Sequence, residues 1–227
     1  MTTPPTQPAS HPTPPTTLLL IRHGETAWNA ERRLQGHLDI PLNLEGERQA
    51  RLLAAALAGE PLDLIVSSDL MRARQTAQAI ADLRGMPLQV EPGLRERCYG
   101  GFEGLLYSEI EARYPRQFAA WQARDVDAVL PPGQNCGETF RDFYTRATGA
   151  ILALARACPG KRLALVAHGG VLECAYRLAT GLPLETPRTF KVFNASVNRF
   201  VLEEGGLVMT SWGEVGHLQP AVLDELN

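Results

Sequence analysis

The chain has 227 residues, of which 44% are hydrophobic and 21% charged, and its formal net charge is -3 at pH 7. These values are typical of a globular protein with one domain or at most two. No basic stripe is visible in the sequence, so we expect neither a nucleic acid nor a membrane surface as a partner. No apolar run approaches the roughly 18 residues of a membrane span, and residues 1–16 lack the hydrophobic core of a signal peptide.

The amino-terminal segment, residues 1–16, contains six of the seventeen prolines and almost no apolar side chain. Such a segment buries too little surface to offset its chain entropy, so we expect a disordered or polyproline-like tail in which His11 is inert. Residues 17–227 are then the folded domain. The four cysteines are spread without CxxC spacing, which predicts neither a disulfide framework nor a zinc cluster and favours a reducing cytoplasm.

The first strand is predicted at residues 17–21, where four large aliphatic residues stand in a row. Such a run is typical of a strand buried on both faces inside a parallel sheet. It ends on Arg22-His23-Gly24, and open α/β sheets bind their ligands just beyond the carboxyl ends of their strands. From this stretch alone, a functional His23 and a structural histidine bonded to a turn carbonyl are equally good interpretations.

Two helices and a strand are predicted next. Asn43 caps a helix that ends at Gly59, and residues 62–66 form a second strand. A second helix follows, with Ser68 or Asp69 as its cap. The apolar faces expected are Leu44, Ala50, Leu53, Ala54 and Leu57 for the first helix, and Ala73, Ala77 and Ile80 for the second.

Arg72 and Arg74 fall in the first turns of that second helix. The free N–H groups and the positive dipole end of a helix N-terminus favour anions, so an arginine there predicts an anion site. We expect one arginine of the pair to be an ordinary solvated surface residue.

The middle of the chain is irregular. A third strand at residues 88–90 leads into a glycine-rich loop, residues 94–104, which carries Glu96 and is expected to be rigid and to line a site. Residues 107–124 form a helix interrupted at Pro115, and residues 138–157 form a long helix.

The fourth strand, residues 162–167, ends on His168-Gly169-Gly170 and leads into a helix at 171–180. This repeats the pattern around His23, and carboxyl ends of parallel strands meet at one edge of a sheet. We therefore expect the two histidines to meet. Further strands are predicted at residues 190–192 and 197–202, with a hairpin at 204–206 leading into 207–209.

Two histidines, two arginines, an asparagine and helix N-termini suit a phosphoryl group, whose transfer depends on positioning and on charge stabilisation. A neutral imidazole can attack phosphorus, and a carboxylic acid such as Glu96 can protonate the leaving oxygen. The sequence has no HExxH, P-loop or clustered Asp/His signature. No metal and no cofactor is expected.

Four blocks of the sequence resemble the histidine phosphatase superfamily, the phosphoglycerate mutase-like proteins, in that family's order. They begin at Arg22-His23-Gly24-Glu25-Thr26, Ser67-Ser68-Asp69, Leu94-x-Glu96 and Val166-Ala167-His168-Gly169-Gly170. The resemblance implies an α/β fold, a three-layer α/β/α sandwich with a mainly parallel central sheet. It makes His23 the phosphorylated nucleophile and Glu96 the proton donor. Arg22, Arg72 and His168 would clamp the phosphoryl group, with Asn29, Gln35 and the Gly169 amide as further contacts.

The blocks leave the branch of the family open. Gln35-Gly36-His37-x-Asp39 resembles the phosphatases, whereas Glu96-Arg97-x-Tyr99-Gly100 resembles the cofactor-dependent phosphoglycerate mutases, in which the arginine and tyrosine contact substrate. Because residues 104–137 are shorter than the covering insertion of the mutases, water should enter the site more readily.

We therefore expect a metal-independent phosphatase for a small phosphorylated metabolite. The mutase is the main alternative, and a non-catalytic phospho-ligand-binding module is a further one. Arg97, Tyr99, His37 and residues 107–137 are the candidates for lining the substrate pocket. The sequence identifies neither the substrate nor the role of the tail, and a homodimer stays open.

Overall fold

The computed structural model describes residues 14–218. Its strands are β1 (Thr16–Arg22), β2 (Leu64–Ser67), β3 (Leu88–Val90), β4 (Arg162–Ala167), β5 (Val197–Glu203) and β6 (Gly206–Glu214). Its helices are α1 (Ala27–Ala30), α2 (Leu44–Ala56), α3 (Met71–Arg84), α4 (Tyr107–Arg113), α5 (Pro115–Gln122), α6 (Phe140–Ala157) and α7 (Gly169–Thr180), with 3-10 turns η1 (Pro92–Leu94) and η2 (Gly100–Phe102). The predicted tail, with His11, falls largely outside the described residues, and β1 already begins at Thr16.

The strands form one six-stranded sheet in the order β3-β2-β4-β1-β5-β6. Strands β3, β2, β4 and β1 are mutually parallel, while β5 and β6 run antiparallel to their neighbours. The hairpin between β5 and β6 closes one side of the sheet. The predicted α/β class with a mainly parallel central sheet is confirmed.

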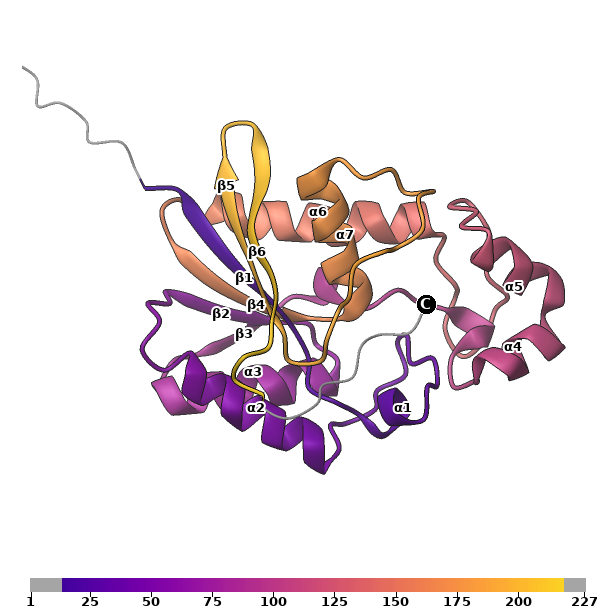
Figure 1. Ribbon diagram of the computed structural model, residues 1–227, viewed down its shortest axis with the longest axis horizontal. Helices are drawn as coiled ribbons and strands as arrows, with labels where there is room; N and C mark the ends of the chain where they lie inside the picture. Colours follow the sequence, from indigo (N-terminus) through magenta and orange to yellow (C-terminus); the bar gives the residue numbers. More distant parts are fainter. Residues whose placement is uncertain (1–13, 219–227) are drawn as a thin grey trace, which may run out of the picture.

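Both faces of the sheet are covered by helices, as Figure 1 shows, with α2 and α3 on one face and α6 and α7 on the other. Successive side chains of a strand point to opposite faces. Accordingly Leu18 and Leu20 pack in the core beneath α6 and α7, whereas Leu19 and Ile21 pack in the core beneath α2 and α3. The uninterrupted aliphatic run of β1 is thus explained by burial on both faces.

The helix caps differ in part from the sequence predictions. Asn43 caps α2 as predicted, its side chain accepting from the Gly46 amide at 2.8 Å. Leu44, however, is 85% exposed, because it lies in the first turn on the side facing away from the sheet. Helix α3 begins after Leu70, and no side chain of that residue caps it. Ser68 accepts from the Leu70 amide at 3.3 Å and does not cap the helix.

Some of the predicted strands differ from the observed ones. Strand β2 begins at Leu64 rather than at residue 62. Residues 190–192 form no strand. The Phe190 ring is partly buried by aromatic contacts instead: it stacks on Tyr176 at 3.7 Å between centroids and meets Trp212 edge-on.

A third, smaller cluster surrounds Phe102, Ile110 and Leu130 and supports α4 and α5 beside the sheet. In Figure 1 these two short helices lie at the end of the molecule opposite the β5–β6 hairpin. Within residues 14–218, no helix is both long enough and apolar enough to cross a membrane.

Candidate active site

The two His-Gly strand ends meet at one edge of the sheet. Strands β1 and β4 are parallel neighbours in a register that pairs Arg22 with Ala167, so the next residues, His23 and His168, leave the sheet side by side. Their ring centroids are 5.2 Å apart, and both side chains are almost completely buried. The structure therefore brings together the pair that the sequence predicted would meet.

His23 has a defined tautomer. Its Nδ1 lies 2.7 Å from the carbonyl oxygen of Gly24, and since a carbonyl only accepts, Nδ1 carries the proton. This leaves the lone pair of Nε2, which accepts from Arg72 Nε at 3.3 Å. Burial, and then the nearby charges of Arg72 and Arg22, hold the pKa of His23 well below its usual value. The imidazole is therefore neutral at physiological pH and has one nitrogen available as a nucleophile.

One ring nitrogen of His168 has a hydrogen-bond partner and the other has none among the described residues. Its Nε2 is 2.8 Å from the hydroxyl of Ser68, while its buried Nδ1 has no hydrogen-bond partner among the described residues. Burial is the main cause that lowers the pKa of His168, and the charge of Arg72 adds to it.

Two buried arginines stand beside His23. Arg22 donates from Nη1 to the Val192 carbonyl at 2.7 Å. Arg72 donates from Nη1 and Nη2 to the carbonyls of Leu38 and Gly36, and burial lowers its pKa to about 10. At that pKa the guanidinium is still charged near pH 7. Arg74 is exposed, so it is the solvated member of the predicted pair.

Glu96 is held by backbone amides at both carboxylate oxygens. Oε1 accepts from the Arg97 amide at 2.7 Å, and Oε2 accepts from the Gly170 amide in the first turn of α7 at 3.0 Å. An added Cβ at Gly170 would lie 2.2 Å from Oε1. The absence of a side chain at position 170 is therefore what lets the acid approach α7.

One cavity collects most of the residues predicted to handle phosphate. Its lining includes Arg22, His23, Asn29, Gln35, Arg72, Glu96 and Tyr99. Asn29 uses its Oδ1 to accept from the amide and hydroxyl of Thr26, which leaves its Nδ2 group for a ligand. Gly169, the first residue of α7, is buried beside His168 but does not line the cavity.

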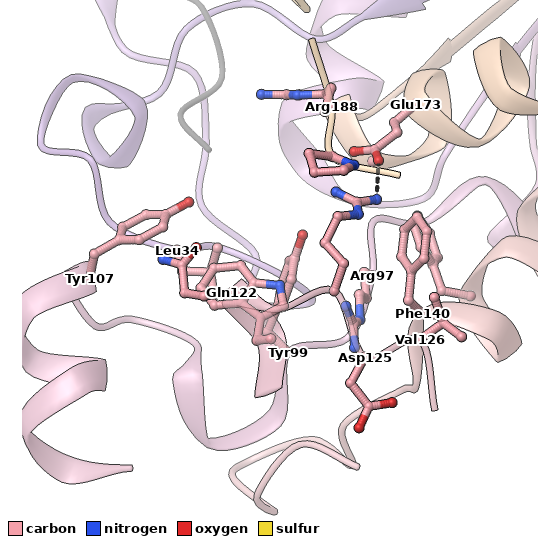
Figure 2. A pocket seen from close by; sticks show the side chains of 15 residues that line it. Leu34, Arg97, Tyr99, Tyr107, Gln122, Asp125, Val126, Phe140, Glu173 and Arg188 are labelled. Carbon is pink, nitrogen blue, oxygen red and sulfur yellow. Dashed lines mark hydrogen bonds and ion pairs between the residues drawn. The ribbon is translucent and has the colours of Figure 1, made fainter. Parts of the chain in front are cut away.

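A second cavity, of about 210 Å³, adjoins the first and shares Leu34, Tyr99 and Tyr107 with it. Figure 2 shows its lining, with the aromatic rings of Tyr99 and Tyr107 on one side and Phe140 on the other. Arg97 belongs to this cavity and places its guanidinium about 5.5 Å from the Tyr99 ring centroid.

His37 takes a different position from the one predicted. It lines neither cavity; its Nε2 donates to the Glu96 carbonyl at 2.7 Å. His37 therefore supports the loop that carries Glu96. Among residues 14–218, no group of three or more His, Cys, Asp or Glu side chains is arranged to hold a metal ion.

Several site residues were missed in the sequence. Asn194 donates to the His23 carbonyl at 3.0 Å, and its buried Oδ1 has no partner in the described part of the chain. Glu173, which lines the second cavity, was also missed; its ion-pair partner at 2.6 Å, Arg124, lies within the predicted pocket segment 107–137 but was not singled out. The polar residues Asn194 and Ser196 between apolar segments could have indicated a site residue. The Arg124–Glu173 pair joins residues 49 positions apart, so no local pattern indicated it.

The family comparison agrees with this geometry. A family model described as the histidine phosphatase superfamily, branch 1, matches residues 18–215. The chain is 38% identical over 205 residues to phosphoglycerate mutase-like protein 4 of Arabidopsis thaliana, covering 89% of this chain and 86% of that protein. It is 37% identical over 205 residues to the metal-independent phosphoserine phosphatase of Arabidopsis thaliana, covering 89% and 83%.

A solved structure with the same fold is that of phosphoserine phosphatase from Entamoeba histolytica in complex with 3-phosphoglyceric acid. The TM-score is 0.79 at 28% sequence identity, and the match covers 89% of this chain and 99% of that one. The buried histidines and arginines thus stand on the scaffold of this enzyme family. The chain therefore belongs to the histidine phosphatase superfamily.

Proposed function

We propose that the chain hydrolyses small phosphomonoesters through a phosphohistidine intermediate formed on His23, without a metal ion. The observation that carries this proposal is the state of His23. Its Nδ1 is fixed as a donor to the Gly24 carbonyl, and its Nε2 lone pair points to the guanidinium of Arg72. A phosphoryl group held by that guanidinium would lie next to the nucleophilic nitrogen.

In the first step, Nε2 of His23 attacks phosphorus in line, and the bond from phosphorus to the ester oxygen breaks. Glu96 gives its proton to that oxygen, which leaves as an alcohol. Arg22 and Arg72 stabilise the negative charge on the equatorial oxygens, and Nδ1 of His168, which has no other partner among the described residues, would donate to them as well.

In the second step, the Glu96 carboxylate accepts a proton from a water molecule. The water oxygen attacks phosphorus, the N–P bond breaks, and the electron pair returns to Nε2 of His23. The products are inorganic phosphate and an enzyme with a protonated Glu96, ready for another cycle. Arg22 and Arg72 supply positive charge in both steps, so neither step requires a metal ion.

The part of the substrate that leaves would occupy the second cavity, beside Arg97 and Tyr99. Its mixed lining of aromatic rings and charged groups suits a small phosphorylated metabolite rather than a macromolecule. The four cysteines are free, in keeping with the cytoplasmic location expected from the sequence.

A phosphoglycerate mutase is the second candidate. It is favoured by Tyr99, which lines both cavities, and by Arg97, which lines the second cavity, where a second phosphorylated molecule could take the phosphoryl group from His23. In that case the phosphoryl group would pass from the phosphohistidine to a bound phosphoglycerate instead of to water. Both functions use the same nucleophile.

The test compares two activities. Phosphate release from p-nitrophenyl phosphate is measured with EDTA present, and isomerisation of 3-phosphoglycerate is measured with and without 2,3-bisphosphoglycerate. We expect EDTA-resistant phosphate release. Strong isomerisation that depends on the bisphosphate, with negligible phosphate release, would replace the phosphatase by the mutase, and inactivity in both assays would favour a binding module.

The nucleophile is tested by labelling. His23→Ala should abolish turnover and the acid-labile phosphate label on the protein. His168→Ala should slow labelling but still permit it, because the variant keeps the attacking nitrogen. Labelling that persists in His23→Ala would show that another residue is the nucleophile.

A further inference from the structure

The loop at residues 95–99, which carries Glu96, lies between η1 and η2 and has no strand or helix of its own. Buried backbone carbonyls and amides need hydrogen-bond partners, and regular structure does not supply them here. The partners come instead from Arg146 on α6 and from Glu138, two residues before that helix begins.

Arg146 places all five of its N–H donors on five acceptors. Nη1 donates to the carbonyls of Gly93 and Arg95, both at 3.0 Å, and Nη2 donates to the carbonyl of Glu96 at 3.1 Å. Nε and Nη2 donate to the two carboxylate oxygens of Glu138, each at 2.8 Å. A guanidinium has five donors in a rigid plane, so this arrangement is specific to arginine.

Glu138 binds the other end of the loop. Its Oε2 also accepts from the Cys98 amide at 2.8 Å, and its own amide donates to the Cys98 carbonyl at 2.8 Å. Its carbonyl accepts from Nε and Nη2 of Arg97. One Arg146–Glu138 pair therefore fixes backbone groups on both sides of Glu96 and also orients the Arg97 side chain.

We propose that Arg146, paired with Glu138, is a positioning residue for the acid Glu96. The carboxylate of Glu96 spans the Arg97 amide in its own loop and the Gly170 amide on α7. The Arg146–Glu138 pair holds the loop at the distance from α7 at which the Glu96 carboxylate also reaches the Gly170 amide. This inference rests on the proposed function, in which Glu96 protonates the leaving oxygen.

The Arg146–Glu138 pair lies near the surface of the fold. The side chains of Arg146 and Glu138 are 27% and 21% exposed, so a substitution opens no cavity in the sheet core. Arg146 also lies over the Phe143 ring, with Cζ 5.2 Å from the centroid, and a role confined to folding would act through that packing. A folding role would lower stability without changing how turnover depends on the leaving group.

The experiment uses two substrates that differ in their need for an acid. p-Nitrophenolate leaves without a proton, whereas the alkoxide of glycerol 2-phosphate requires one. The measured quantity is kcat/KM, because it covers the steps up to departure of the leaving group. General acid catalysis contributes about 100-fold or more, so Glu96→Gln should lose that factor on glycerol 2-phosphate and much less on p-nitrophenyl phosphate.

Arg146→Met should follow the same pattern. We expect glycerol 2-phosphate to lose about 10- to 100-fold more than p-nitrophenyl phosphate, as for a catalytic group displaced by about 1 Å. Arg146→Lys keeps the charge but has only three donors, so its ratio should lie between those of the wild type and Arg146→Met. If Arg146→Met does not fold, a wild-type ratio in Arg146→Lys overturns the proposal.

Arg199→Met is the matched control. Arg199 is 28% exposed and bridges Glu60 and Glu214, so it resembles Arg146 in exposure and in its acidic partners, but it lies on β5 away from the loop. Its variant should lose stability and keep the wild-type ratio of the two substrates. Equal losses of kcat/KM on both substrates in Arg146→Met would assign Arg146 a folding role and overturn this inference. Equal losses on both substrates in Glu96→Gln would instead overturn the acid role of Glu96 in the proposed function.

Discussion

Stability should fall steeply as the pH drops below 6.5, because two histidines are buried in their neutral form. His23 and His168 have folded-state pKa values held well below the usual 6.5, mainly by burial. Below pH 6.5 the unfolded chain therefore binds protons that the folded chain does not, and the free energy of unfolding decreases as the pH falls. Above that pH both states leave these imidazoles neutral, and the loss disappears.

The size of the effect follows from linkage. A group that titrates at 6.5 in the unfolded chain and stays neutral in the fold costs about 1.4 kcal/mol of stability between about pH 7.5 and 5.5. Two such histidines cost about 2.7 kcal/mol, a large share of the roughly 5–15 kcal/mol of an ordinary domain. His37 and His217 are half-buried with lowered pKa values and add smaller losses of the same sign. Carboxylates with lowered pKa values titrate below this window.

Urea unfolding followed by tryptophan fluorescence at several pH values measures this directly. The variant His23→Gln removes one titrating group, so about half of the pH-dependent loss should vanish. A free energy of unfolding that stays constant between about pH 7.5 and 5.5 would refute the reasoning. So would a variant that retains the full wild-type slope, because the protons would then bind elsewhere.

Three glycine substitutions give further predictions. Gly170→Ala puts a Cβ 2.2 Å from Glu96 Oε1, so kcat/KM for an alkyl phosphate should fall about 100-fold, and near-normal activity would show that the acid can shift without cost. Gly46→Ala puts a Cβ 2.0 Å from the Glu25 carbonyl and should cost roughly 1–3 kcal/mol in urea unfolding. Gly149→Ala, exposed on α6 with nothing within 4 Å, is its control and should add about 0.5–1 kcal/mol; equal effects at both positions would contradict the close-approach argument.

The parts of the fold that obey local rules were predictable. The aliphatic runs of β1 and β4 identified the central strands, and Asn43 identified the start of α2. Leu44 was misplaced because helical periodicity says nothing about which first-turn residue still faces the sheet. Residues 190–192 were misplaced because an apolar segment buried by aromatic stacking has the same composition as one buried in a sheet.

In the site, too, residues in local sequence patterns were predictable and long-range contacts were not. His23, Arg72, Glu96 and His168 were identifiable because each stands next to a strand or helix end in a distinctive block. The support around them was not, since the contacts of Arg146 with the Glu96 loop span about 50 residues of chain. Pairings of that kind depend on how α6 packs against the loop, and no local pattern encodes them.

The two His-Gly strand ends also explain how one local sequence can serve the two chemical roles that we propose. After His23 the chain enters a loop, so the Gly24 carbonyl can accept a hydrogen bond from Nδ1–H, which leaves Nε2 as the proposed nucleophilic nitrogen. After His168 the chain enters α7, where the Gly169 carbonyl belongs to the helical hydrogen-bond ladder. Nδ1 of His168 therefore keeps no local acceptor, and its ring is fixed instead through Nε2 by Ser68. The two proposed roles, attack on phosphorus and binding of its oxygens, would thus differ because the chain continues as a loop after His23 and as a helix after His168.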